Sequence, residues 1–211
     1  MKTAMVWGAA GGIGRAVTEE LIANDWNVIV LSRHESSFAG LNVHSLHADI
    51  ASPFSVQQAI QAAAFEVDTV NLFVYAAGDI TSSPVEDMEP DTWNRILASN
   101  LTGAYLTIHY SLPLLAPDAH IVIVGAISER LRLPGLSAYS AAKAGLEAFA
   151  EALRKEQRKR RVTLVRPSAV ATALWDKVPM RMPKDSPPPN KVAKRILEAY
   201  QDGHAGVLDL A

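Results

Sequence analysis

The chain contains no cysteine. Without thiols it can hold neither a disulfide framework nor a thiolate metal site, and it has no cysteine nucleophile. No segment approaches the roughly 18 consecutive apolar residues of a membrane span. The first residues carry one lysine and then break into glycines too early for the apolar region of a signal peptide. We therefore expect a soluble, cytoplasmic protein.

Charge of one sign is also not in excess. The 20 Lys and Arg residues nearly balance the 22 Asp and Glu residues, and both signs are interspersed. Such a surface creates no field that favours nucleic acid or an anionic membrane. The one basic run, residues 154–161, falls at the end of a predicted helix, where cations complement the helix dipole. The six histidines show no metal-ligand spacing. A small molecule is the expected partner, with no nucleic acid, membrane or metal.

Short apolar runs alternate with amphipathic stretches along the whole chain. Several runs are continuous, which is typical of strands buried on both faces of a parallel sheet. The predicted strands cover residues 4–7, 28–31, 43–46, 70–75, 121–124, 162–165 and 206–208. The predicted helices cover residues 13–23, 53–64, 91–115, 137–158 and 191–200. This alternation predicts a doubly wound α/β fold with helices on both faces, in one domain over residues 1–211.

Local signals place two helix starts and one long loop. Ser52 before Pro53 predicts an N-cap followed by proline at the first helical position. Asn190 is placed to cap the last helix. Residues 175–189 are too rich in proline for a helix or a central strand, so we expect a loop there.

The first predicted strand leads directly into a glycine-rich turn, Gly8 to Gly14, and then into a helix. Glycines make a tight turn and let backbone N–H groups approach a phosphate at the positive end of the helix dipole. Strand, turn and helix in this order predict a dinucleotide pyrophosphate site. A plain β-to-α turn is the alternative.

Tyr139 and Lys143 lie four residues apart in a predicted helix and so share one face. A free tyrosine, with a pKa of about 10, is a poor acid or base at neutral pH. A neighbouring cation favours the phenolate, and lowering the pKa by about 3 units needs roughly 4 kcal/mol of differential stabilisation. The pair predicts an acid/base couple, although its spacing alone also arises by chance.

Taken together, the glycine turn and the Tyr139–Lys143 pair resemble the classical short-chain dehydrogenase/reductase family. Further landmarks follow in the family's order: Asp49–Ile50, Tyr75 to Gly78, Asn100 to Gly103, and Pro167 to Thr172. The resemblance implies a Rossmann-type sheet of about seven strands. It also implies hydride transfer between a nicotinamide cofactor and a small carbonyl or alcohol substrate.

The resemblance also implies which residues hold the cofactor, grouped by the part of the cofactor they meet. They are Gly8, Ala10, Gly11, Gly12, Ile13 and Gly14 at the pyrophosphate; Asp49 and Ile50 at the adenine; Ala76, Ala77 and Gly78 at the adenosine ribose; Pro167, Val170 and Thr172 at the nicotinamide end; and Tyr139 with Lys143. Two positions depart from the family pattern: Trp7 stands where threonine is usual, and Ala76 where asparagine is common.

The choice between the two nicotinamide cofactors depends on three residues. NAD-dependent members carry an acidic residue at the end of the second strand, and this chain has Ser32 there. Arg33 follows, and Arg15 comes just after the glycine turn, so two guanidiniums are placed to meet a 2′-phosphate. We therefore expect NADP(H) to be preferred over NAD(H). The alternative is two solvated surface arginines.

In the family mechanism the tyrosine, here Tyr139, gives a proton to the carbonyl oxygen. Lys143 lowers its pKa and holds the cofactor ribose, and Asn100 supports the lysine through a water. The serine that usually steadies the substrate oxygen is replaced by Ala126. Loss of one such donor reduces the rate by about 10²–10³-fold if nothing replaces it.

Three interpretations of this loss remain open. Ser128, two residues on, would point to the same side of an extended chain and substitute for the serine. Alternatively the substrate develops little oxyanion charge, as in the quinonoid dihydropteridine reductases of this family, which also lack the serine. Finally, the chain binds NADP(H) without turnover, as a sensor or scaffold.

Two further expectations concern surfaces. Residues 175–189 fall where family members place a substrate lid, and Trp175, Met180 and Met182 offer it apolar contacts. Family members commonly pair through the helices predicted at residues 91–115 and 137–158. Small residues in the second of these would allow close approach: Ala138, Ala141, Ala142, Ala144, Gly145 and Ala148. A homodimer or homotetramer is expected.

Overall fold

The computed structural model describes residues 1–210, with the side chains of Glu35 and Ser36 excepted. Seven strands form one parallel sheet in the order β3-β2-β1-β4-β5-β6-β7. They are β1 (Thr3–Trp7), β2 (Asn27–Ser32), β3 (His44–His47), β4 (Val70–Tyr75), β5 (Leu115–Val124), β6 (Arg161–Pro167) and β7 (Gly206–Leu210). The predicted doubly wound Rossmann-type sheet is confirmed.

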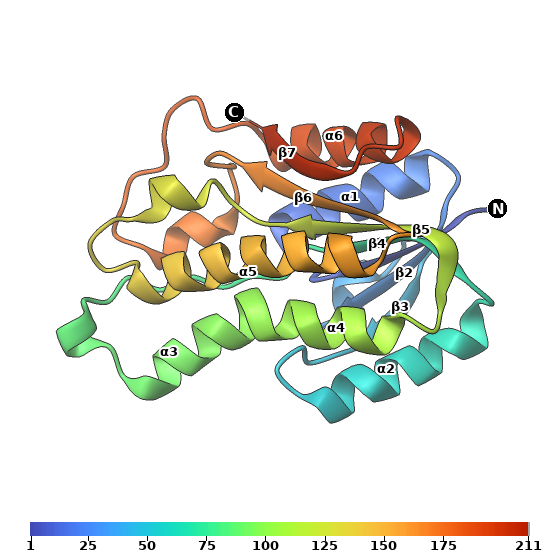
Figure 1. The fold of residues 1–211 in the computed structure, drawn as a ribbon, viewed down its shortest axis with the longest axis horizontal. Helices are drawn as coiled ribbons and strands as arrows, with labels where there is room; N and C mark the ends of the chain where they lie inside the picture. Colours follow the sequence, from blue (N-terminus) through green and yellow to red (C-terminus); the bar gives the residue numbers. More distant parts are fainter. Residues whose placement is uncertain (211) are drawn as a thin grey trace.

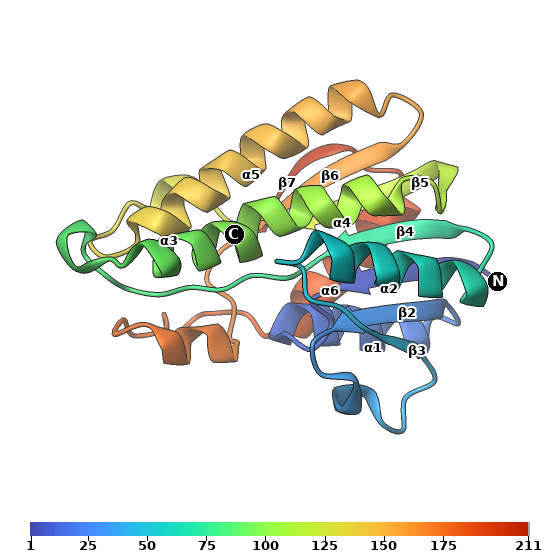
Figure 2. The same cartoon turned by 90° about the horizontal axis from the view of Figure 1, so that it is seen from below.

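Helices cover both faces of the sheet (Figures 1 and 2). One face carries α1 (Gly12–Ala23) and α6 (Pro189–Gln201), and the other carries α2 (Pro53–Glu66), α3 (Pro90–Leu97), α4 (Gly103–Ser111) and α5 (Ser137–Glu156). Successive strand residues point to opposite faces, so Met5 and Trp7 enter one apolar core while Ala4 and Val6 enter the other. The sheet therefore separates two cores, which is why its strands read as continuous apolar runs.

The connections contain short helical turns. These are the 3-10 turns η1 (Glu35–Phe38), η2 (Val85–Asp87), η4 (Ser128–Leu131) and η5 (Ala173–Lys177), and the π-helical turn η3 (Ala98–Thr102). Two parts of the chain project beyond the carboxyl ends of the strands, at the left of Figure 1. They are helix α3 and the segment that connects β6 to α6.

One of the two predicted helix caps is confirmed. The Ser52 side chain accepts a hydrogen bond from the Ser55 N–H at 3.2 Å, and Pro53 begins α2. The expectation for Asn190 is wrong, because α6 begins one residue earlier at Pro189, with Pro188 as the N-cap. Proline needs no N–H at the first helical position and its fixed φ suits the helix. Pro189 therefore takes the first helical position, ahead of Asn190.

The helix predicted over residues 91–115 is two helices joined by the π turn, and it ends at Ser111. Leu115 instead opens β5, six residues before the predicted strand start at residue 121. Leu114 already contacts the sheet, since its carbonyl accepts from the Val70 N–H at 2.9 Å. The pairing of β4 with β5 is irregular between Val70 and Leu72. The leucines at the irregular beginning of β5 continue the apolar pattern of the preceding helix. The periodicity of apolar residues alone therefore could not locate the boundary.

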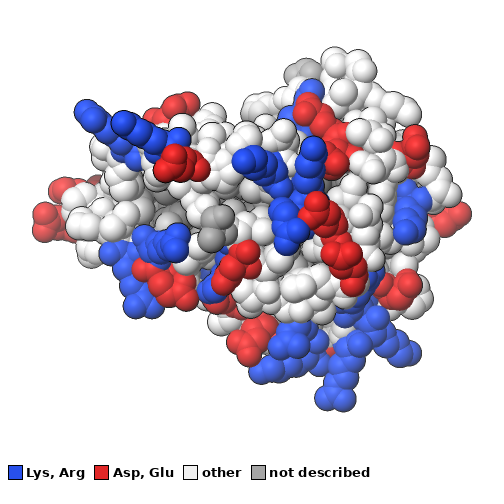
Figure 3. Space-filling model, turned by 90° about the horizontal axis from the view of Figure 1, so that it is seen from above, with Lys and Arg blue, Asp and Glu red and all other residues white. Residues whose placement is uncertain are grey.

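Strand order reverses beside β1, which lies between β2 and β4. Ligands of open α/β sheets bind at the carboxyl ends of the strands at such a switch point. On the face seen in Figure 3, over α1 and α6, basic and acidic side chains are intermingled. None of the helices described over residues 1–210 is long and apolar enough to cross a membrane.

Candidate active site

The glycine turn brings the ends of β1 and β4 into direct backbone contact. Gly8 has φ +74°, and a Cβ there would lie 2.5 Å from the backbone N and Cα of Ala77. Only glycine fits this position, because a side chain would face both a left-handed backbone and a clash with Ala77. The turn and the segment predicted to line the adenosine ribose, Ala76 to Gly78, therefore lie together at the switch point.

The first turn of α1 is open to an anionic group. Its N-cap, Gly11, provides no side-chain cap bond. Ala10, Gly11 and Gly12 are exposed, while Gly14 is packed so tightly that a Cβ there would lie 2.3 Å from the Gly8 carbonyl oxygen. Uncapped N–H groups at a helix N-terminus suit a pyrophosphate, so these residues fit a dinucleotide cofactor.

Thr172 lies over the same turn. A Cβ at Gly12 would lie 2.6 Å from Thr172 Cγ2, so the predicted pyrophosphate and nicotinamide-end residues meet here. A hollow of about 460 Å³ opens beside them. It is lined by Ala10, Gly12, Arg15, Ala16, Glu19, Ala173, Pro188, Pro189 and Asn190. Pro167 ends β6, and the buried Val170 accepts a hydrogen bond from Trp175 Nε1 at 2.9 Å.

The residues predicted to read the adenosine end lie at the ends of β2 and β3. The Ser32 hydroxyl accepts from the His34 N–H at 3.2 Å and donates to its carbonyl at 3.1 Å. Asp49 Oδ1 accepts from the Ala51 N–H at 3.0 Å. A Cβ at Gly103 would lie 3.1 Å from Ile50 Cδ1, so Ile50 packs against α4. These contacts order both loops. The end of β2 carries the Ser32 hydroxyl and no carboxylate.

The two arginines of the cofactor prediction differ in their surroundings. Arg15 Nε pairs with Glu19 at 2.6 Å, and Nη1 donates to the Ser37 carbonyl at 2.5 Å. The same guanidinium lies 5.8 Å from the Phe38 ring centroid. Arg15 is thereby held against the loop that follows β2, beside Ser32 in the chain, whereas Arg33 is exposed.

Tyr139 and Lys143 lie buried on one face of α5, with relative exposures of 8% and 5%. Lys143 Nζ lies 5.7 Å from the Tyr139 ring centroid. It also donates to the carbonyl of Val124, the last residue of β5, at 3.2 Å. The structure thus brings the predicted acid/base pair together and fixes it to the end of the sheet.

The pKa values of this pair depart from the expectation. Burial raises the pKa of Tyr139 to about 12 and lowers the pKa of Lys143 to about 8. Loss of water disfavours the charged form of both groups, so in the protein alone burial determines the direction of both shifts. At neutral pH the phenol keeps its proton.

Asn100 lies inside the π turn, where its side chain points to the same region. Its Nδ2 donates to the carbonyls of Asp79 at 2.7 Å and Ile96 at 2.9 Å. Its Oδ1 is buried and has no partner among the described residues. A Cβ at Gly78 would lie 3.0 Å from this oxygen and 3.9 Å from Lys143 Nζ. Gly78, Asn100 and Lys143 thus meet around an acceptor that remains free for a ligand or a water.

Tyr75 supports the π turn, a role that the sequence did not reveal. Its hydroxyl donates to the Ser99 carbonyl at 2.8 Å. Burial raises the pKa of Tyr75, so the hydroxyl stays a donor. An extra residue in the helix leaves a carbonyl without its regular partner, and Tyr75 satisfies it.

Ala126 leaves the usual serine position without a hydroxyl, and Ser128 is engaged elsewhere. Ser128 Oγ donates to Glu147 Oε2 at 3.0 Å. Glu147 in turn accepts from Arg166 Nη1 at 2.8 Å. Ser128 would have to leave this bond before it could donate to a substrate oxygen.

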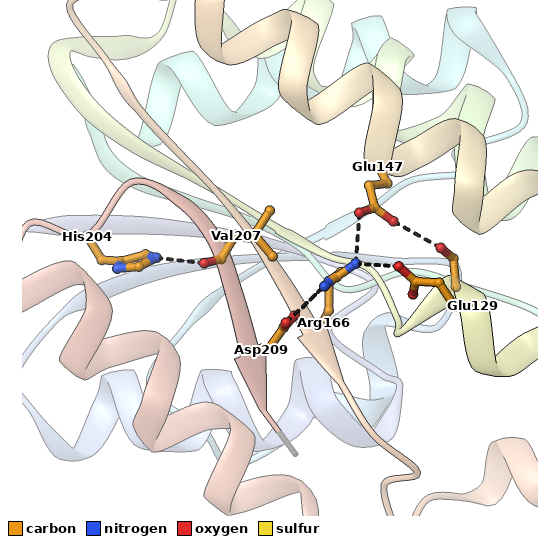
Figure 4. Close-up of polar contacts among 7 residues, drawn as sticks. Glu129, Glu147, Arg166, His204, Val207 and Asp209 are labelled. Atoms are coloured by element: carbon orange, nitrogen blue, oxygen red, sulfur yellow. Dashed lines mark hydrogen bonds and ion pairs between the residues drawn. The ribbon is translucent and has the colours of Figure 1, made fainter.

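Ser128 thus belongs to a polar group that we call the Arg166 cluster: Ser128, Glu129, Glu147, Arg166 and Asp209. Arg166 lies between Glu129 and Glu147 on one side and Asp209 on the other (Figure 4). It binds Asp209 with two nitrogens, at 2.6 and 2.9 Å, and is 14% exposed. Hydrogen bonding to Asp209 raises the pKa of Arg166, and the same bond lowers the pKa of Asp209. The cluster ties η4, α5, β6 and β7 together.

The predicted lid, residues 175–189, packs onto an apolar group that includes the acid/base tyrosine. We call this group the Tyr139 cluster: Ile80, Ile96, Leu136, Ala138 and Tyr139. Val178 and Met180 pack against it, whereas Met182 is 44% exposed. Trp175 starts the lid within η5 and bonds back to Val170. Val178 and Met180 thus hold this segment against the apolar group that contains Tyr139.

The sequence is similar to known proteins over most of its length. Residues 2–182 match the family model of the short chain dehydrogenases. The chain is 31% identical over 181 residues to carbonyl reductase family member 4 of Danio rerio, covering 81% of this chain and 76% of the relative. It is 29% identical over 171 residues to the 3-oxoacyl-acyl-carrier-protein reductase FabG of Salmonella typhimurium, covering 77% and 70%.

Solved structures share the fold. An alcohol dehydrogenase from Thermococcus sibiricus, complexed with 5-hydroxy-NADP, superposes with a TM-score of 0.90 at 21% identity and covers 100% of this chain and 96% of its own. The aldohexose dehydrogenase of Thermoplasma acidophilum has a TM-score of 0.87 at 23% identity, covering 99% and 91%. Glycine turn, buried Tyr139–Lys143 pair and sequence match agree: this chain belongs to the short-chain dehydrogenase/reductase family and is an NAD(P)-dependent oxidoreductase.

Proposed function

We propose that the protein is an NADP(H)-dependent oxidoreductase acting on a small carbonyl or alcohol, with Tyr139 as the proton donor and acceptor. The observation that carries this proposal is the buried Tyr139–Lys143 pair, which lies beside Gly78 and Asn100 and under the lid. Acid/base groups with perturbed pKa values in such a place are typical of reaction centres.

Tyr139 is suited to the reducing direction. When bound, a reduced nicotinamide supplies the hydride. The phenol of Tyr139 keeps its proton at neutral pH and gives it to the carbonyl oxygen of the substrate. The Lys143 ammonium, with a pKa of about 8, is mostly charged at pH 7 and stabilises the phenolate left behind. The free Oδ1 of Asn100 is placed to accept a hydrogen bond from a water. Such a water links Lys143 to solvent and provides a path by which Tyr139 regains its proton.

A second candidate reaction is favoured by the position of Ser128. Its hydroxyl is bonded to Glu147, and Ala126 offers none. A substrate that develops little oxyanion charge needs no second donor beside Tyr139. Reduction of a quinonoid dihydropterin is a reaction of this kind and uses the same tyrosine and lysine.

A substrate panel separates these reactions. NADPH absorbance is followed with simple ketones, quinones and quinonoid dihydropterin, with Tyr139→Phe as the matched control. Turnover of ketones supports the carbonyl reductase, and turnover of dihydropterin alone supports the second candidate. Binding of NADPH without turnover of any class would contradict both and leave a silent NADP(H)-binding sensor or scaffold.

The preference for NADP(H) is proposed from Arg15 and Arg33 and from the absence of a carboxylate at Ser32. Arg15 is anchored by Glu19 and Ser37 beside the loop after β2, where the 2′-phosphate is expected. A charge-assisted hydrogen bond contributes about 1.5–3 kcal/mol, so Arg15→Gln should weaken NADPH binding by about tenfold or more. NADH binding should change little.

Fluorescence titration measures both cofactors. Arg195→Gln serves as the control, because Arg195 forms an exposed pair with Glu198 on α6. Equal affinity of the wild type for NADH and NADPH would show that the preference is absent.

We propose a homodimer or homotetramer that pairs through α4 and α5. Ala141, Ala144 and Ala148 are exposed along α5, and Tyr105 on α4 is 48% exposed. The other small residues of α5 pack within the chain, since Ala138 and Ala142 are buried and Gly145 lies against Leu101. Light scattering should show an oligomer that Ala144→Arg dissociates. A monomeric wild type would contradict the proposal.

A further inference from the structure

Asp79 follows Gly78 directly and so lies beside the proposed site. Its carboxylate is bonded to two cations, Lys177 Nζ at 2.6 Å and the Arg95 guanidinium. Asp79 is mostly buried, with a side-chain exposure of 16%, whereas Lys177 and Arg95 are about half exposed. The two cations come from different elements, Lys177 from the lid and Arg95 from α3.

The backbone of Asp79 serves a different partner. Its carbonyl accepts from Asn100 Nδ2 at 2.7 Å. Arg95 also donates to Thr81 Oγ1 at 2.7 Å, which holds the segment after β4 against α3. One residue therefore joins the lid, through its carboxylate, to the π turn that carries Asn100, through its carbonyl.

The ion pair lies next to the part of the lid that packs on the Tyr139 cluster. Val178 follows Lys177, and both Val178 and Met180 pack on the Tyr139 cluster. We expect this apolar contact to be lifted when a substrate enters beside Tyr139. Lys177 moves with Val178 because the two are adjacent in the chain. The Asp79–Lys177 pair must therefore break on opening and form again on closure.

We propose that Asp79 is a positioning residue that latches the lid shut through Lys177 over the Tyr139 cluster. The role in catalysis rests on the proposed function, but the latch itself does not. Partly exposed ion pairs shift an equilibrium by only about two- to fivefold. Such a latch favours the closed lid during the reaction and still releases it in every turnover. Arg95 on α3 binds the other oxygen of the same carboxylate.

Hydrogen exchange followed by mass spectrometry tests the latch without any substrate. The N–H groups of Trp175 and Val178 bond within η5, to Thr172 and Trp175, and they exchange when this segment opens. In Asp79→Asn and in Lys177→Gln the segment should exchange about two- to fivefold faster. The double variant should be no faster than either single variant, because both remove one interaction.

Two controls separate the latch from a general loss of charge. Arg95→Gln leaves the Asp79–Lys177 pair intact, so exchange of the lid should stay at the wild-type rate or become slower. Asp79→Glu, which restores the carboxylate, should return exchange towards the wild type. Added salt should accelerate exchange in the wild type and not in Lys177→Gln. An unchanged rate in Lys177→Gln, a variant of an exposed side chain that will fold, would overturn the latch.

Kinetics test the catalytic part separately. With a substrate that the wild type reduces, Lys177→Gln should raise KM by about two- to fivefold while the affinity for NADPH stays the same. Faster lid exchange without a rise in KM would overturn the claim that the latch serves the substrate. If no substrate is found, the proposed function fails, and the exchange experiment still decides the latch.

Discussion

Two polar groups lie along α5, and they differ in how completely their hydrogen bonds are made. At the start of the helix, Lys143 donates to one carbonyl, and the buried Oδ1 of nearby Asn100 has no partner in the part of the chain that the structure describes. Further along the helix, Glu147 accepts from both Ser128 and Arg166, and Arg166 also binds two more carboxylates. A buried polar group without a partner reduces stability. This difference agrees with the proposed role of the first group as a reaction centre, and it makes the Arg166 cluster a structural joint between elements.

Tyr139→Phe should give the largest effect. Removal of the general acid should lower kcat by about 10³-fold, since such groups contribute 10²–10⁴. The free energy of unfolding should hardly change, because the ring remains in the Tyr139 cluster. Steady-state kinetics and urea unfolding measure the two quantities. Activity that survives in this variant would remove Tyr139 from the mechanism.

Lys143→Met should separate activity from stability. Activity should fall by at least about 10²-fold. Stability at pH 7 should rise by about 1–3 kcal/mol, because a buried ammonium with a lowered pKa is replaced by an apolar group of similar shape. Between pH 8 and 10.5 the unfolded wild type binds more protons than the folded one, so the wild type gains stability and the difference shrinks. A variant less stable than the wild type would contradict this interpretation of Lys143.

Arg166→Met should have the opposite effect, with stability lowered and activity nearly unchanged. It leaves three carboxylates without their common cation, and we expect a loss of about 2 kcal/mol in the free energy of unfolding. Below the melting temperature, kcat should stay within about threefold of the wild type. Arg195→Met, which breaks an exposed pair on α6, is the control and should lose less than about 1 kcal/mol. A loss of activity larger than the loss of stability would make the cluster part of the site.

His120 in β5 is a third buried polar group, outside the two groups compared above. It bonds Thr163 through Nε2 at 2.8 Å, while its buried Nδ1 has no partner among the described residues. Burial, with the charges of Arg161 and His204, lowers its pKa to about 3. Below pH 6.5 the unfolded chain binds a proton that the folded protein does not, so stability falls as the pH falls, by up to about 1.4 kcal/mol per pH unit.

His120→Gln should therefore show a smaller loss of stability between pH 7 and pH 5 than the wild type, by about 1–2 kcal/mol. Urea unfolding at both pH values measures it, with the exposed His109→Gln as the control. Equal losses in wild type and variant would show that His120 is not held neutral.

The sheet and the glycine turn could be predicted from the sequence because both depend on local patterns. Continuous apolar runs predict strands covered on both faces, and Gly8 and Gly14 occupy positions where a Cβ would clash. The helix boundary at Ser111 and the cap of α6 could not be placed, since leucines and prolines near them allow more than one start or end.

Neither the Arg166 cluster nor the proposed latch could be predicted from such local patterns. Arg166 and Asp209 are 43 residues apart, and Asp79 and Lys177 are 98 residues apart, so only the finished fold brings them together. The burial that raises the pKa of Tyr139 also comes from the packed cluster around it, which the spacing to Lys143 does not reveal. Composition reveals charges, whereas their surroundings appear only in three dimensions.

The π turn at Ala98–Thr102 makes part of this site depend on residue count as well as on residue type. Deleting one residue there would restore a regular helix, and every side chain of α4 would turn by about 100° relative to α3. Asn100 would leave Gly78 and Lys143, and Tyr105 would leave the surface proposed for pairing. An insertion or deletion in this one helical turn would thus alter the proposed reaction centre and the proposed subunit contact in a single step.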